Sequence, residues 1–289
     1  MTVPPETTAF IKRLASFALP GGGVPYYRGG GPSAEPTLLA LLALSAPGSP
    51  AGGEAAKSLL AWVSGLQNGD GSLGLNPSHR DQGLWLTALA AVVFERCGLA
   101  GPRDRALTFL SSVCSVTVAN TPGVRQDNGI VGWPWVSGTF GWVEPTAWSV
   151  IALSVCGRGG EARAAEGVRF LLDRQIPSGG WNYGNPGIND RELLPFWDTT
   201  GLALVALGGR TEAGRVRASL DFLETNQEKI ASLCGLAWTV MGLETWGREA
   251  ARLRQRLLGV MNAPPDDGLN AAYFAAGMLA LSGRKVFAP

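Results

Sequence analysis

Six short segments of this chain are almost free of charge, and they recur along its whole length. Each is dense in Leu, Ala, Val and Ile, and four of the six begin with a carboxylate and carry no other charge. A helix with so few charged residues around its circumference has to be buried on most sides. The segments span residues 35–44, 81–90, 144–153, 198–207, 234–243 and 272–281.

The segments that precede them have a different pattern. Most carry Arg, Lys, Glu or Asp on one helical face and Phe, Leu or Val on the other, which is typical of a helix with one side in water. These outer segments span residues 4–19, 53–66, 102–115, 161–174, 214–226 and 249–261.

Twelve alternating helices predict an all-α fold. We expect an α6/α6 toroid, in which six hairpins form an inner ring of apolar helices wrapped by an outer ring of amphipathic ones. An open solenoid of hairpins is the alternative, but it would leave one face of each apolar helix in water. No linker interrupts the pattern, so residues 1–289 are interpreted as a single domain.

The composition excludes several classes of function. The chain has 24 basic and 23 acidic residues, so nothing in its charge predicts a nucleic-acid partner. No uninterrupted apolar run is long enough to span a membrane, and the first ten residues lack the pattern of a signal peptide. A cytoplasmic location is therefore expected, and a peripheral contact with a membrane is left open.

Cysteine and histidine are sparse. Cys97, Cys114, Cys156 and Cys234 are widely separated without a Cys-x-x-Cys pair, and His79 is the single histidine. We therefore expect four packed thiols and no metal site. No cofactor is predicted, and a requirement for Mg²⁺ is left open.

A glutamine and glycine turn follows several outer helices. Its clearest copies are residues 67–74 (Gln-Asn-Gly-Asp-Gly-Ser-Leu-Gly) and 175–184 (Gln-Ile-Pro-Ser-Gly-Gly-Trp-Asn-Tyr-Gly). Glycine supplies the left-handed backbone that such turns need, and the glutamine amide can bond neighbouring backbone groups. We interpret the motif as a structural clasp.

With these turns and its Thr-containing inner helices, the chain resembles the repeats of squalene-hopene and oxidosqualene cyclases and of protein prenyltransferase β subunits. The resemblance covers residues 10–283 and implies the toroid fold. It also implies an isoprenoid ligand in the central cavity. Because one of the families is a β subunit, the resemblance leaves open whether a partner subunit completes the site.

Carboxylates at the starts of the inner segments are candidate catalytic groups. In a toroid Glu35, Asp81, Glu144 and Asp198 would all face one mouth of the cavity. Helix capping explains each of them equally well, whereas burial and mutual repulsion in a cavity would raise the pKa of some and leave a proton donor.

The family comparison ranks these acids. Cyclases that protonate a double bond carry Asp-x-Asp-Asp-Thr at the start of an inner helix, and the matching stretch here is Pro195-Phe196-Trp197-Asp198-Thr199. The last Asp and the Thr persist, while the central acid is replaced. The resemblance therefore implies Asp198 as the candidate acid, followed by Glu144 and Asp81. The zinc ligands of prenyltransferases are not matched around Cys234.

Aromatic residues gather at the same mouth and are interpreted either as packing or as a wall that binds an apolar ligand. Two long loops, 116–143 and 176–197, are expected to cover this mouth. The predicted substrate-binding residues are Trp85, Trp133, Trp142, Trp148, Trp181, Tyr183, Trp197 and Trp238.

Three functions follow from these observations. The leading hypothesis is an isoprenoid or terpenoid enzyme of the cyclase or prenyltransferase type. The first alternative is a non-catalytic ligand-binding or scaffold protein on the same toroid. The second is a carbohydrate-active enzyme, since paired acids with aromatic platforms also suit sugars.

Overall fold

The structure is a computed structural model that describes residues 5–45, 52–83, 85–189, 191–263, 268–283 and 286–287. Its helices alternate between two rings. The inner helices are α2 (Ala34–Leu44), α4 (Leu86–Arg96), α6 (Val143–Val155), α8 (Trp197–Leu207), α10 (Leu233–Thr245) and α12 (Ala271–Leu281). The outer helices are α1 (Pro5–Ala15), α3 (Gly52–Ser64), α5 (Ala100–Ser112), α7 (Ala162–Asp173), α9 (Ala213–Asn226) and α11 (Ala251–Met261).

Small elements complete the turns. Strand β1 (Val24–Pro25) pairs antiparallel with β2 (Pro32–Ser33), with Val24 opposite Ser33, and β3 (Gly187–Ile188) pairs antiparallel with β4 (Arg191–Glu192), with Gly187 opposite Glu192. A 3₁₀ turn, η1 (Gln227–Lys229), follows α9. None of the described helices is long and apolar enough to cross a membrane.

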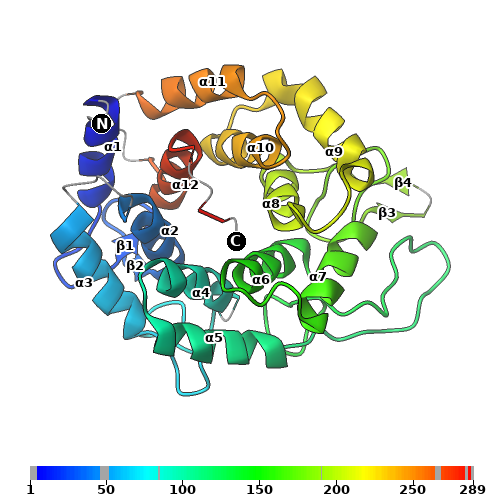
Figure 1. The fold of residues 1–289 in the computed structure, drawn as a ribbon, viewed down its shortest axis with the longest axis horizontal. Helices are drawn as coiled ribbons and strands as arrows, with labels where there is room; N and C mark the ends of the chain where they lie inside the picture. The colour runs from blue at the N-terminus through cyan, green and yellow to red at the C-terminus, as the bar shows by residue number, and fades with distance from the viewer. Residues whose placement is uncertain are drawn as a thin grey trace.

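The ring closes. Each inner helix packs against the next, and α12 packs against α2, so the first and last hairpins are neighbours (Figure 1). This confirms the α6/α6 toroid and excludes the open solenoid. The physical reason is the one expected from the sequence: α2, α6 and α8 are buried on nearly every side and carry a charge only in the first turn.

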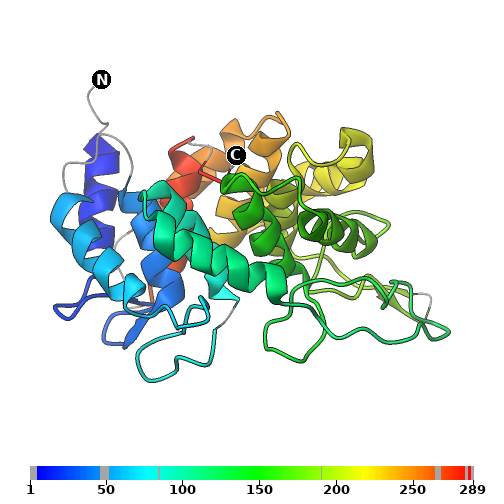
Figure 2. The same ribbon diagram turned by 60° about the horizontal axis from the view of Figure 1, so that its bottom comes forward.

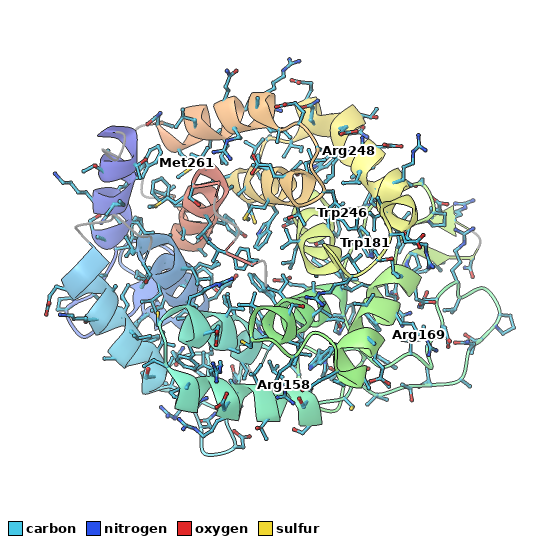
Figure 3. All side chains as sticks on the ribbon, viewed as in Figure 1. Arg158, Arg169, Trp181, Trp246, Arg248 and Met261 are labelled. Carbon is cyan, nitrogen blue, oxygen red and sulfur yellow. The ribbon has the colours of Figure 1, made fainter. Side chains whose placement is uncertain are left out.

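The outer helices are joined around the ring by arginine side chains. The guanidinium of Arg163 donates to the carbonyls of Val113 and Gly132, and that of Arg13 donates to the carbonyls of Met261 and Ala263. Residues 13 and 261 are 248 positions apart, so Arg13 helps to close the circle. Figure 3 shows the charged side chains on the outside of the ring, with Trp181 and Trp246 between the two layers.

A threonine near the start of four inner helices fixes each turn on its helix. The backbone N–H groups of Val24, Leu73, Trp133 and Trp181 donate to the hydroxyls of Thr37, Thr87, Thr146 and Thr200, at 2.8–2.9 Å. All four threonines are buried. Because the same bond recurs in four hairpins, these threonines occupy equivalent positions, and the hairpins can be aligned on them.

That alignment corrects one predicted helix. Residues 81–90 were expected to form an inner helix that begins at Asp81, but α4 begins at Leu86. Asp81 is exposed in the preceding turn. Its Asp-Gln-Gly sequence forms a turn because Gly83 has a φ of +76°, a backbone conformation that does not continue a helix.

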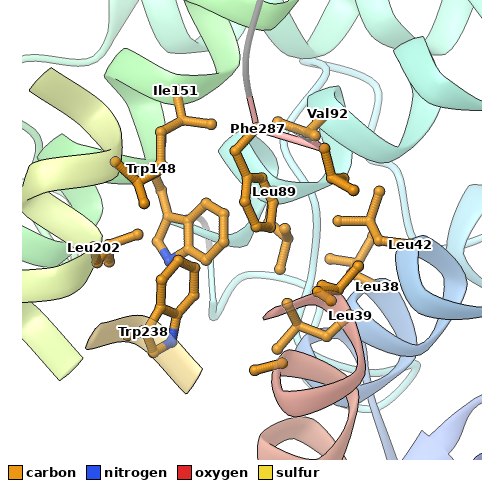
Figure 4. Close-up of a cluster of buried hydrophobic side chains, with 14 of the residues drawn as sticks. Leu38, Leu39, Leu42, Leu89, Val92, Trp148, Ile151, Leu202, Trp238 and Phe287 are labelled. Carbon is orange, nitrogen blue, oxygen red and sulfur yellow. The ribbon is translucent and has the colours of Figure 1, made fainter. Parts of the chain in front are cut away.

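The middle of the inner ring is filled by aromatic side chains. The rings of Trp148 and Trp238 meet edge to face with centroids 5.4 Å apart, and Phe287 packs on both, at 5.4 and 5.7 Å (Figure 4). The carbonyl of Val286 accepts two hydrogen bonds from Arg96 at the end of α4. The end of the chain thus enters the ring from the side where the inner helices end.

The long loops lie on the opposite side. Figure 2 shows the segments that lead into α6 and α8 gathered at the N-terminal ends of the inner helices, away from the C-terminus. The toroid therefore has two different ends, which we call the N-terminal mouth and the C-terminal mouth of the inner ring.

Candidate functional site

The candidate site lies at the N-terminal mouth. The second residue of each inner helix faces it, two positions before the anchoring threonine where that threonine is present. These positions hold Glu35, Glu144, Asp198, Cys234 and Ala272, and Trp85 takes the corresponding place beside α4.

Glu144 has a strongly raised pKa. Burial, followed by the nearby charges of Glu35 and Asp198, raises its pKa to about 8. No ion pair among the described residues neutralises these three acids. Glu144 is nevertheless partly exposed to solvent. A carboxyl group with this pKa is mostly protonated at neutral pH and is therefore able to donate a proton.

Glu35 is held by a phenol. Burial raises the pKa of Glu35, and the hydroxyl of Tyr26 donates a short hydrogen bond to its Oε2. Burial and the charge of Glu35 likewise raise the pKa of Tyr26. The pair is positioned by the β1–β2 turn, and the anchoring bond from Val24 to Thr37 fixes that turn on α2.

Asp198 faces the thiol of Cys234. The Cys234 Sγ lies 4.0 Å from Asp198 Oδ2, while Oδ1 accepts the N–H of Thr199 at 2.9 Å. Burial raises the pKa of Cys234, and the charges of Asp198, Glu144 and Glu35 raise it further, so the thiol stays neutral and can donate to the carboxylate. Tyr273 of α12 completes this side of the mouth, and burial is the main cause that raises its pKa to about 12.

The structure brings Glu144 and Asp198 together and leaves Asp81 outside. Asp81 lies in the exposed turn before α4, and the place expected for it is taken by Trp85, which packs edge to face on Trp135 at 4.8 Å. The predicted set of acids therefore loses Asp81 and includes Glu35, which belongs to the same ring.

Apart from Trp85, the residues of the predicted aromatic wall fall into three groups: the middle of the ring, the space between the two rings, and a groove at the N-terminal mouth. Trp148 and Trp238 lie four residues after Glu144 and Cys234 and pack on each other in the middle of the ring. Trp133 and Trp181 are buried between the rings, where their indole N–H groups donate to the carbonyls of Leu110 and Leu171. These two indoles stabilise the turns.

Trp197 also points away from the ring axis. Its ring stacks on Phe222 of α9 with centroids 4.9 Å apart and an angle of 11°. The contact fills the space between α8 and the outer ring.

Trp142 and Tyr183 line an apolar groove at the N-termini of α6 and α8. Its volume is about 440 Å³, and Leu193, Leu194 and Phe196 form much of the rest of its wall. The ring of Tyr183 packs on that of Phe196 at 4.9 Å. Burial, followed by the charges of Asp198 and Glu144, raises the pKa of Tyr183. Neither acid lines the groove, but Trp142 and Phe196 in its wall stand two residues before Glu144 and Asp198.

The acids do not form a metal centre. In the described part of the chain, no three His, Cys, Asp or Glu side chains are grouped so that they could hold a metal ion. The charges of Glu35 and Asp198 act instead on Glu144, whose pKa they help to raise after the larger effect of burial.

Solved structures share this architecture. An α-amylase from Clostridium perfringens superposes with a TM-score of 0.68 at 8% identity, over 98% of this chain and 99% of that one. A protein from Actinoplanes gives a TM-score of 0.60 at 16% identity, over 96% and 99% of the two chains. The chain has the α/α-toroid fold.

A terpenoid cyclase is also among these structures. The ent-copalyl diphosphate synthase from Streptomyces platensis gives a TM-score of 0.57 at 18% identity, over 86% of this chain and 49% of the synthase. No protein-family model and no curated protein matches the sequence. At these identities the likeness concerns the fold alone.

One signal in the sequence would have given the correct ring. Aligning Thr87 with Thr37 and Thr146 places Trp85, and not Asp81, opposite Glu35 and Glu144. The threonine is the better marker because its hydroxyl makes a buried bond in four of the hairpins, whereas an acid before a helix occurs in many turns.

Proposed function

We propose that the protein is an enzyme that protonates an unsaturated, isoprenoid-type substrate at the N-terminal mouth of the toroid. The observation that carries the proposal is the apolar groove at the N-termini of α6 and α8, whose wall residues Trp142 and Phe196 stand two positions before Glu144 and Asp198. A groove of about 440 Å³ is within the range of small-molecule sites. An apolar chain in it would present one end to the acids.

Glu144 is assigned as the proton donor. Its pKa of about 8 keeps it protonated at neutral pH. In the proposed step its proton is transferred to one carbon of a double bond, and a second double bond attacks the resulting cation to form a carbon–carbon bond. Loss of a proton to the Asp198 carboxylate then gives a product with the mass of the substrate.

Aromatic faces beside the acids support a cationic intermediate. Trp142, Tyr183 and Phe196 line the groove, and an aromatic face stabilises a desolvated positive charge by about 1–2 kcal/mol. The repeat resemblance and the likeness to a copalyl diphosphate synthase favour the same substrate class.

The test uses the purified protein with geranylgeraniol and geranylgeranyl diphosphate as probes. We expect an isomeric product detectable by gas chromatography and mass spectrometry, after dephosphorylation for the diphosphate. Glu144→Gln should lower the rate by at least ~10²-fold, the usual contribution of general acid catalysis. Asp81→Asn is the matched control and should leave the rate unchanged, because Asp81 lies outside the mouth.

A carbohydrate substrate is the second candidate. A carboxyl group with a raised pKa beside a second carboxylate is also the arrangement that hydrolyses glycosidic bonds, and Tyr27, Tyr183 and Tyr273 expose aromatic surface at this end of the ring. The likeness to an α-amylase agrees with it. The test is the release of reducing ends from maltoheptaose. If the wild type shows this activity and Glu144→Gln does not, the protein is a carbohydrate-active enzyme and the isoprenoid proposal is wrong.

The third outcome concerns a binding protein. Saturable binding of geranylgeraniol that is equal in the wild type and in Glu144→Gln, without turnover of either isoprenoid or of maltoheptaose, would overturn the enzymatic proposal. It would establish the non-catalytic alternative on the same toroid.

A further inference from the structure

A second cavity lies at the C-terminal mouth of the ring, at the opposite end from the acids. Its volume is about 280 Å³, and it is enclosed by the last turns of α6, α8, α10 and α12 together with the end of the chain. The apolar part of its wall includes Ile151, Val205, Met241, Leu279 and Phe287. It uses none of the groups assigned to the proposed reaction.

Arg210 brings a positive charge to this cavity. It follows Gly208 and Gly209 directly after α8, and its guanidinium reaches toward the end of α6, where a Cβ on Gly159 would lie 2.6 Å from Arg210 Nη1. Arg210 is half-buried, and burial lowers its pKa. Its guanidinium makes no hydrogen bond or ion pair with any residue that the structure describes.

The other hairpins show that this is unusual within the fold. A left-handed glycine followed by an arginine ends four inner helices. Three of these arginines belong to the described residues, at Gly157-Arg158, Gly209-Arg210 and Gly247-Arg248, whereas Arg284 after Gly283 lies outside them. Arg158 forms a bidentate ion pair with Glu161, at 2.5 and 2.9 Å, and Arg248 pairs with Glu224. Arg210 is the equivalent residue, but the position that corresponds to Glu161 holds Ala213.

The remaining polar groups of the cavity are satisfied within the protein. Glu244 pairs with Arg254 at 3.0 Å, and the hydroxyls of Ser154 and Thr245 donate to the carbonyls of their own helices. Arg210 is therefore the one charged group of the lining for which the described residues offer no partner.

We propose that this cavity binds a small amphipathic carboxylate, with its charged group on Arg210 and its alkyl chain against Met241, Leu279 and Phe287. Guanidinium and carboxylate groups form strong bidentate hydrogen bonds. At ~30 Å³ for each non-hydrogen atom, as in liquid water, the cavity has room for about nine such atoms, which corresponds to a chain of roughly six to eight carbons.

Titration calorimetry of the full chain with octanoate and with 1-octanol tests the proposal. The two probes share a chain length and differ in charge. We expect saturable binding of octanoate at least 10-fold tighter than that of octanol. Arg210→Gln should remove this difference, and its melting temperature should be measured first to confirm that it is folded.

Arg158→Gln and Arg248→Gln are matched controls. They remove the same charge at equivalent positions whose arginines already have acidic partners, so octanoate affinity should stay within 2-fold of the wild type. Phe287→Ala would enlarge the cavity and should shift the preference from octanoate toward dodecanoate.

Met241→Trp provides a second variant that does not depend on Arg210. It should fill the cavity and abolish binding of both probes. The proposal is overturned if octanoate fails to bind the wild type, if it binds no better than octanol, or if Arg210→Gln retains the full affinity.

Discussion

The backbone amide of Ala271 donates a 2.8 Å hydrogen bond to the carbonyl of Tyr26. The bond joins the start of the last inner helix to the first turn of the chain. Ala34 makes the same bond to Leu75 in the next hairpin, also at 2.8 Å. The contact that closes the ring is therefore built like the contacts within it.

The Ala271 amide should be strongly protected from hydrogen exchange. Ala271 is fully buried, and its hydrogen bond breaks only if α12 leaves the first hairpin. We expect its exchange to require the global unfolding free energy, like that of amides in the middle of α6. Exchange at the rate of a frayed helix end would show that the ring opens locally.

Gly71→Ala should be strongly destabilising. Gly71 has a φ of +91°, and a Cβ there would lie 2.2 Å from the carbonyl oxygen of Arg105. Backbone strain and the clash together should cost at least about 3 kcal/mol of unfolding free energy, measured by urea denaturation. Gly69→Ala in the same turn is the control, because its Cβ would meet nothing within 4 Å. Equal effects in the two variants would contradict the geometry of the clasp.

Thr146→Val tests the bond that holds the turns. The hydroxyl of Thr146 accepts the N–H of Trp133 at 2.9 Å in a buried position, so valine leaves that N–H without its acceptor. We expect a loss of about 1–3 kcal/mol in unfolding free energy. Thr108→Val on the exposed face of α5 should stay within about 0.5 kcal/mol. A loss no larger than that of the control would show that the bond contributes little.

Stability should fall as the pH rises from 6 to 8. The pKa of Glu144 is about 8 in the folded protein against an ordinary value of 4.5, so the folded state holds an extra proton between these values. Stability then falls as pH increases, because the unfolded state binds fewer protons. The raised pKa of Glu35 acts in the same direction.

The measurement is the melting temperature at pH 6 and pH 8. We expect the wild type to lose about 5 °C more than Glu144→Gln over this interval, since 1 kcal/mol corresponds to about 2–4 °C in a large domain. Asp81→Asn should behave like the wild type. An identical pH dependence in Glu144→Gln would mean that Glu144 is ionised throughout the range.

The fold was predictable because the segments with almost no charged residues are the ones that become buried. Inner helices such as α6 and α12 have no face that water could wet, and a closed ring is the arrangement that covers all of them. Boundaries were less predictable. Asp81 has the sequence of a helix start, but the left-handed Gly83 delays the helix to Leu86.

The candidate site was predictable in its location and only partly in its members. Glu144 and Asp198 could be placed because each stands at the start of a charge-free helix. The bond between Tyr26 and Glu35 depends on how the β1–β2 turn folds back on α2, and Phe287 belongs to a short tail without periodicity. Contacts of that kind follow from tertiary packing and leave no local pattern.

The closing contact also sets the order in which the molecule can mature during synthesis. The carbonyl that accepts the hydrogen bond of Arg13 belongs to Met261, which is synthesised 248 residues later. Until α12 has left the ribosome, the flank of α2 that it covers faces water with no charged residue beyond Glu35 to keep it apart from other nascent chains. A chain arrested before its sixth hairpin should therefore aggregate or engage a chaperone, whatever the stability of the finished ring.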